Sequence, residues 1–149
     1  MADVTPIKKL LVANRGEIAR RIMRTAHDMG ISTVAIFAEG DARAPFVNEA
    51  DTAIFLEGRT STETYLDVEK VINACKRSGA DAVHPGYGFL SENEGFAQAI
   101  IDAGIKWIGP SPEVIGLMGD KLSAKNLMTE AGVPTLPAIE ITDKLDVLK

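Results

Sequence analysis

The chain has 149 residues, 46% of them hydrophobic, and a formal net charge of −5 at pH 7. A length of this order suits one domain, or one domain with part of another. The acidic balance argues against a nonspecific nucleic-acid binder, and no apolar run approaches the roughly 20 residues that cross a bilayer.

Short apolar runs alternate with amphipathic segments over the first 109 residues. The runs are apolar on both faces, which indicates buried strands of a parallel sheet. The predicted strands cover residues 8–15, 32–38, 51–56, 81–84 and 106–109, and the predicted helices cover residues 16–30, 62–79 and 91–104. This alternation predicts an α/β fold, a Rossmann-like open parallel five-stranded sheet with helices on both faces and right-handed crossovers.

Two of these helices have an apolar face at helical spacing. The face of the first helix is predicted to consist of Ile18, Ile22, Ala26 and Met29. The face of the second helix is predicted to consist of Tyr65, Val68, Ile72 and Cys75. Glycines that follow them, Gly30 and Gly79, are typical helix stops.

The pattern changes after Pro110. Two helical segments, residues 111–120 and 121–132, follow each other without a strand between them. Residues 133–138 contain two prolines and are predicted to be extended, and residues 142–149 begin another helix. Because a helix of less than two turns is unstable alone, we expect the chain to be a piece of a longer protein.

Cys75 is the only cysteine, so the chain can form no internal disulfide and no cysteine-rich metal site. We interpret it as a small buried residue on a helix. The N-terminal sequence MADVTPIKK lacks the apolar core of a signal peptide. These features predict a cytoplasmic protein, or a processed protein of an organelle matrix.

Unusual residues occupy three loops that follow predicted elements at the expected ligand-binding edge of the sheet. In the first loop, ANRGEIA, Asn14 and Glu17 have the spacing of a capping box. Gly16 stands alone where a dinucleotide site would have three glycines, which argues against such a site. Arg15 is either part of a well-capped helix start or a cation directed at the crevice.

The second loop, HPGYGFLSEN, places Tyr87 between Gly86 and Gly88. Glycine adopts positive φ at low cost, so the chain can turn sharply there and present N–H groups to an anion or polar ligand. A strained connection with Tyr87 folded over the core is the other interpretation. Ser91 and Glu94 are predicted to form a capping box, with the helix starting near residue 92.

The third loop, MGDKLSAK, contains a predicted N-cap, Asp120, followed by Lys121 in the first turn of a helix. A cation there opposes the helix dipole. Lys121 is therefore either an exposed lysine screened by Asp120 or a ligand that shares a phosphate with the helix N-terminus.

Three blocks, KKLLVANRGEIARRIMRTAHDMGI, ADAVHPGYGFLSEN and IGPSPEVIGLMGDKLSAKNLMTEAGVP, resemble the biotin carboxylase family in this order. The resemblance implies that residues 1–117 form the family's N-terminal, pre-ATP-grasp domain. It also implies that residues 118–149 are the helical start of an ATP-grasp domain. The carbamoyl-phosphate synthetase large subunit shares the fold more distantly but not these blocks together.

The resemblance implies an activity for the complete protein. Enzymes of this family use MgATP to activate bicarbonate as carboxyphosphate and then carboxylate biotin on a carrier protein. The implied cofactors are ATP and Mg²⁺, and the implied partners are a biotin carboxyl carrier and a carboxyltransferase subunit. The family's glycine-rich loop, Mg²⁺-binding glutamates and catalytic arginine lie beyond Lys149, which implies an inactive fragment without catalytic or metal-binding residues of its own.

The resemblance also assigns site residues. Lys121 matches the lysine that contacts ATP phosphate, and Tyr87 and Gly88 match the loop that borders the biotin and bicarbonate pocket. The turn at the same crevice consists of Asn14, Arg15, Gly16 and Glu17.

The resemblance also concerns residues outside the three loops. Arg24 and Asp28 match the helix of the bacterial homodimer interface, and by spacing alone they form an exposed i,i+4 pair. The sequence departs from the family after the second strand, where Phe46 stands in place of a common histidine, and this stretch resembles an actinobacterial-type acyl-CoA carboxylase variant.

Two functions from different classes remain open. In the first, the chain is the N-terminal part of an ATP-dependent biotin carboxylase. In the second, it is a free-standing, non-catalytic α/β module for binding or dimerisation. The incomplete helix at residues 142–149 favours the first.

Overall fold

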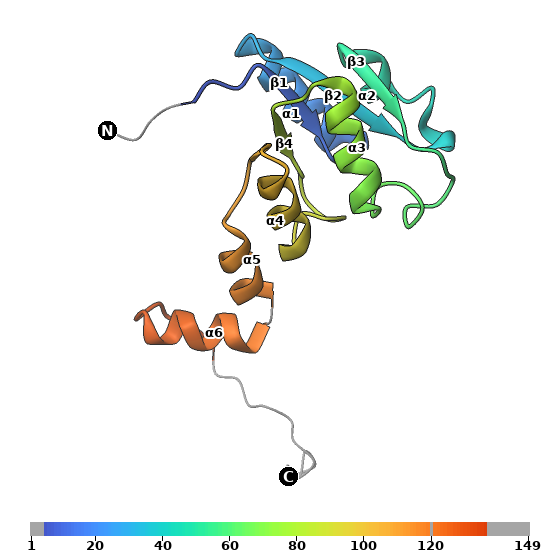
Figure 1. Ribbon diagram of the computed structural model, residues 1–149. Coiled ribbons are helices and arrows are strands. Elements are labelled where there is room, and N and C mark those ends of the chain that lie inside the picture. Colours follow the sequence, from blue (N-terminus) through green and yellow to red (C-terminus); the bar gives the residue numbers. More distant parts are fainter. Residues whose placement is uncertain (1–4, 120, 137–149) are drawn as a thin grey trace.

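The computed structural model of the chain describes residues 5–119 and 121–136. Within them lies a five-stranded sheet of order β3-β2-β1-β4-β5, in which each neighbouring pair is parallel (Figure 1). The strands are β1 Lys9–Val12, β2 Ser32–Phe37, β3 Thr52–Phe55, β4 Ala82–His84 and β5 Lys106–Trp107. The predicted fold class is confirmed.

Helices cover both faces of this sheet. Those of the described residues are α1 Gly16–Asp28, α2 Pro45–Glu49, α3 Val68–Ser78, α4 Glu94–Asp102, α5 Pro112–Gly119 and α6 Lys121–Glu130, with a 3₁₀ turn at Glu39–Asp41, and the first four of them lie against the sheet. Helices α1 and α2 pack on one face through Met23 and Phe46, which form one buried cluster with Val12 of β1. Helices α3 and α4 cover the other face.

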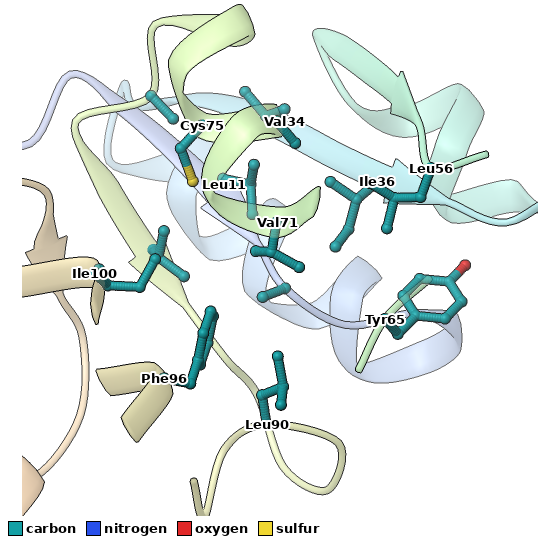
Figure 2. Close-up of a cluster of buried hydrophobic side chains, with 14 of the residues drawn as sticks. Leu11, Val34, Ile36, Leu56, Tyr65, Val71, Cys75, Leu90, Phe96 and Ile100 are labelled. Atoms are coloured by element: carbon teal, nitrogen blue, oxygen red, sulfur yellow. The ribbon is translucent and has the colours of Figure 1, made fainter. Parts of the chain in front are cut away.

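The larger core lies under α3 and α4 (Figure 2). Leu11 of β1 contributes to it, whereas its neighbours Leu10 and Val12 belong to clusters on the opposite side. Alternate residues of a strand point to opposite faces, so Leu10–Val12 of β1 are all apolar because both faces of the strand are buried. Cys75 is fully buried in the larger core, as predicted, and burial raises the pKa of its thiol to about 12.

The buried face of α1 differs from the predicted one by about one residue. Ala19, Met23 and Ala26 are buried against the sheet, whereas Met29 is 69% exposed. Ile18 and Ile22 are only partly buried and line an apolar groove beside the helix. The apolar arc of α1 is therefore wider than the part that the sheet covers.

Two helices start later than predicted, and the cause is capping. Asp67 accepts a hydrogen bond from the N–H of Lys70 at 3.0 Å, so α3 begins at residue 68 instead of residue 62. Asn93 accepts from the N–H of Phe96 at 2.8 Å, so α4 begins after it. The predicted Ser91–Glu94 capping box was wrong, because a better cap lies two residues further on.

Helices α5 and α6 form at the predicted places and extend away from the sheet (Figure 1). Helix α5 buries Ile115 and contacts α4, whereas no described residue of α6 is buried. The predicted cap Asp120, part of the predicted extended stretch and the predicted helix at 142–149 lie outside the described residues.

Asp51 joins the amino ends of β2 and β3. Its carboxylate accepts from the N–H of Thr33 at 2.7 Å and lies 3.1 Å from Nε2 of His27. The Thr33 N–H lowers the pKa of Asp51, against the opposing effect of burial, and His27 lowers it further. Because the folded-state pKa lies below the unfolded one, this stabilisation is present above about pH 4 and is lost as the pH falls through the folded-state value.

We therefore expect Asp51→Asn to lower the free energy of unfolding near neutral pH by about 1 kcal/mol, a modest value because half of the side chain is exposed. The difference from the parent should shrink below about pH 4. Urea unfolding across this range measures it. Asp102→Asn is the matched control, because among the described residues the carboxylate of Asp102 is bonded only to Gln98. A pH-independent loss for Asp51→Asn would contradict the explanation.

Candidate functional site

The site lies where the order of the strands reverses. From β1 the chain proceeds to β2 and β3 on one side, and then to β4 and β5 on the other. The loops after β1 and β4 therefore leave adjacent strands at their carboxyl ends. In open α/β sheets this crevice is where ligands bind.

Asn14 connects these two loops. It is 3% exposed, and its Nδ2 donates to the carbonyl oxygens of Pro85 at 2.8 Å and Tyr87 at 2.7 Å. Its Oδ1 accepts from the N–H of Arg15 at 2.9 Å. The predicted capping box was wrong: the residue at the N-cap position of α1 is Arg15, and no side chain caps it.

The glycines of the second loop have the predicted conformation. Gly86 and Gly88 both have φ of +66°. A Cβ atom on Gly86 would lie 2.8 Å from Nδ2 of Asn14, so only glycine fits the contact between the loops. The N–H of Gly86 donates to Nδ1 of His84 at 3.0 Å, and burial lowers the pKa of His84, which favours the neutral ring that can accept this bond.

Tyr87 does not fold over the core. Its side chain is 57% exposed, and its hydroxyl donates to the carboxylate of Glu17, which raises the pKa of Tyr87. The aromatic residue that covers the core from this loop is Phe89, whose ring stacks on Tyr65 at a centroid distance of 5.1 Å. The first loop thus holds Tyr87 at its carbonyl through Asn14 and at its hydroxyl through Glu17.

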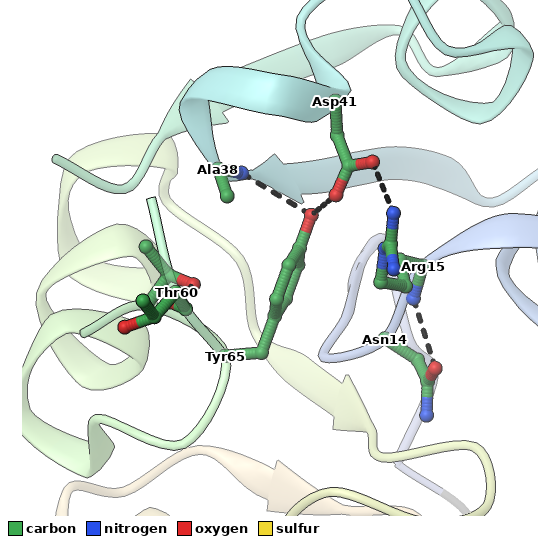
Figure 3. A network of polar contacts seen from close by, with 7 residues as sticks. Asn14, Arg15, Ala38, Asp41, Thr60 and Tyr65 are labelled. Carbon is green, nitrogen blue, oxygen red and sulfur yellow. Dashed lines mark hydrogen bonds and ion pairs between the residues drawn. The ribbon is translucent and has the colours of Figure 1, made fainter. Parts of the chain in front are cut away.

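Arg15 is bound by a network that sequence reasoning missed (Figure 3). Its guanidinium donates to Asp41, which is 8% exposed and also accepts from the hydroxyl of Tyr65 at 2.5 Å. The N–H of Ala38 donates to the same hydroxyl at 3.2 Å. The side chain of Arg15 is half-exposed, and it forms an ion pair with Asp41. In the sequence, this network could have been suspected only from the position of Asp41, which follows β2 at the same edge of the sheet as Arg15.

The remaining predicted residues lie elsewhere. Lys121 is the exposed first residue of α6, a helix that extends away from the sheet. Arg24 and Asp28 are exposed on α1, where they line a polar groove of about 600 Å³ with Arg20 and Glu49. Within the described ranges no ion pair joins Arg24 to Asp28; Arg20 pairs with Glu49 instead, at 2.6 Å.

A family model described as the N-terminal domain of biotin carboxylase matches residues 6–115. This chain belongs to the biotin carboxylase family. A relative described as the biotin-dependent acyl-coenzyme A carboxylase alpha3 subunit of Mycobacterium leprae is 55% identical over 131 residues, which are 88% of this chain and 22% of the relative. A biotin carboxylase of Halalkalibacterium halodurans is 49% identical over 134 residues, 90% of this chain and 30% of that protein.

Solved structures of the biotin carboxylase family agree with the fold. The biotin carboxylase domain of Hydrogenobacter thermophilus 2-oxoglutarate carboxylase, described as a dimer in complex with MgADP, ADP and bicarbonate, is 48% identical, with a TM-score of 0.85. The match covers 90% of this chain and 29% of that one. This chain thus spans less than a third of the length of these relatives.

Phe46 of α2 is 1% exposed and belongs to the buried cluster that contains Met23 of α1 and Val12 of β1. A phenyl ring at this buried position adds to the core instead of serving a ligand. Over residues 5–119 and 121–136, no group of three or more His, Cys, Asp or Glu side chains could hold a metal ion. No helix in the same ranges is long and apolar enough to span a bilayer.

Proposed function

We propose that this chain is the N-terminal part of an ATP-dependent biotin carboxylase, the ligase that carboxylates carrier-bound biotin with bicarbonate in an acyl-CoA carboxylase. The observation that carries the proposal is the family match, which spans residues 6–115 and therefore both loops of the site. The relative from Mycobacterium leprae supports the acyl-CoA carboxylase assignment.

We place a domain boundary between residues 117 and 118. Ile115 is the last buried residue among those described, and α6 beyond it buries none. Residues 1–117 would then form the pre-ATP-grasp domain around the sheet. Residues 118–149 would begin the ATP-grasp domain, whose core this chain does not supply.

The site residues have separate roles in this proposal. Tyr87 and Gly88 border the biotin and bicarbonate pocket, next to the turn from Asn14 to Glu17. Lys121 contacts an ATP phosphate, with the N-terminus of α6 beside it. MgATP, when bound, supplies the phosphoryl group that activates bicarbonate, and we place no Mg²⁺ ligand among the described residues.

The partners follow from the same assignment. We propose a biotin carboxyl carrier domain or protein and a carboxyltransferase subunit, in a cytoplasmic enzyme. The polar groove that contains Arg24 and Asp28 would face a second copy in a homodimer. In an antiparallel pairing of two α1 helices, Arg24 of one copy could meet Asp28 of the other, because a two-fold interface pairs each residue reciprocally.

The test measures phosphate release from ATP by a full-length protein that contains this chain. We expect release that requires both bicarbonate and biotin. The 149-residue chain alone should match the enzyme-free blank, because it spans less than a third of its relatives. A full-length protein without biotin-dependent release would overturn the proposal and favour a non-catalytic module.

A further inference from the structure

The crevice at the strand reversal is filled by a side chain. In a dinucleotide-binding fold this position would admit a pyrophosphate close to the backbone. Here the carboxamide of Asn14 occupies it, in contact with both loops and 3% exposed. The absent Cβ of Gly86 leaves the space that the Nδ2 atom takes.

Asn14 has little capacity left for a ligand. A carboxamide has two N–H donors and one carbonyl oxygen. Both donors go to the carbonyls of Pro85 and Tyr87, and the oxygen accepts from Arg15. Among the described residues no other group donates to these two carbonyls. A buried carbonyl without a donor is costly, so the buried carbonyl of Pro85 in particular depends on this side chain. Asn14 therefore acts on the loop and not on a substrate.

The loop that Asn14 holds has backbone N–H groups that could donate to a ligand. Among the described residues, the N–H of Gly86 is bonded to His84, but no hydrogen bond engages the N–H of Tyr87 or Gly88. Backbone N–H groups held in a fixed turn bind polar and anionic groups well, because no reorganisation is needed on binding.

We propose that Asn14 is a positioning residue, which fixes the Tyr87–Gly88 backbone and thereby sets the affinity of the site for biotin. The inference rests on the proposed function, and it adds a residue that acts through the loop without touching the substrate. The two N–H groups of the Asn14 carboxamide are essential for this role, so a side chain of the same shape without them should not hold the loop.

Asn14→Asp isolates the donors, because it keeps the size of the side chain and the oxygen that accepts from Arg15. In the full-length protein we expect the KM for biotin to rise about tenfold or more, while the Kd for ATP stays within about twofold. Two carbonyl oxygens facing a carboxylate favour its protonated form. Protonation restores one donor, so the defect should shrink as the pH is lowered from about 8 to about 6.

Asn93→Asp is the matched control. Asn93 contributes only its oxygen, as the cap of α4, and aspartate caps equally well. The same chemical change should leave the KM for biotin unaltered there. A KM for Asn14→Asp equal to that of the parent, or a defect that does not respond to pH, would overturn the inference.

Gly86→Ala is a second variant that acts on the same contact from the other side. Its new methyl group would lie 2.8 Å from Nδ2 of Asn14, whereas Gly30→Ala, at φ of +72°, meets nothing within 4 Å. Both changes carry the strain of positive φ. Only Gly86→Ala should raise the KM for biotin; equal effects of the two would overturn the inference.

Hydrogen exchange of this chain tests the role of Asn14 independently of the proposed enzyme activity. Asn14→Asp should speed exchange at the amide of Gly86 more than in the strands. If the amide is unaffected, the positioning inference fails whatever the enzyme does. If the amide responds but the full-length parent shows no biotin-dependent turnover, the proposed function fails instead.

Discussion

Phe96→Ala is expected to lower the free energy of unfolding of this chain by about 3 to 5 kcal/mol, a large share of the 5 to 15 kcal/mol of a typical domain. Phe96 is fully buried, and its ring is perpendicular to that of Trp107 at a centroid distance of 5.5 Å. Truncation removes apolar burial and leaves a cavity between α4 and the sheet. Urea unfolding monitored by circular dichroism measures the loss.

Phe55→Ala removes the same group from a different environment. Phe55 lies on the edge strand β3 and is 42% exposed, although its ring contacts Phe37. We expect a loss of about 1 kcal/mol or less. Similar losses for the two variants would mean that α4 does not depend on its packing against the sheet.

Lys121→Met in the full-length protein is expected to weaken ATP binding roughly 10- to 150-fold, which corresponds to about 1.5 to 3 kcal/mol of charge-assisted hydrogen bonds. Methionine keeps much of the aliphatic stem, and the exposed position of Lys121 implies little change in packing. Stability should hold or rise slightly, because a cation leaves the first turn of α6. Calorimetric titration with ATP gives the affinity, and thermal unfolding gives the stability.

Lys125→Met is the control, because Lys125 lies on the same helix one turn later. It should bind ATP as the parent does. In the 149-residue chain neither change should have a measurable effect on ATP binding. Unaltered ATP affinity in full-length Lys121→Met would show that Lys121 is a surface lysine and nothing more.

The fold was predictable because its signals are local. Strands β1 and β2 contain short apolar runs, Leu10–Val12 and Val34–Phe37, and α1 repeats apolar residues every three to four positions, so each element can be recognised within a short window. The exact starts of α3 and α4 were not predictable from periodicity. Each depends on which of several neighbouring polar residues caps the helix, and Asp67 and Asn93 proved better placed than earlier candidates.

The site was predicted in position but not in its contacts. The residues at the carboxyl ends of β1 and β4 were identified, yet Asn14 was interpreted as a helix cap because capping is a local pattern. Its real partners are 71 and 73 residues away. The pairing of Arg15 with Asp41 spans 26 residues, and no spacing rule connects residues at such a separation.

The central place of β1 has a consequence for the order in which the protein is made. Translation yields β1, β2 and β3 first, and residues 56–81 must follow before β4 emerges, roughly 1 to 5 s at typical rates of synthesis. During that interval the apolar β1 is an open edge of a half-built sheet, a hazard for association with other chains. The Nδ2 group of Asn14 has neither of its partners during this interval, because Pro85 and Tyr87 have not yet been made, so the contact between the two loops forms only after β4 has followed.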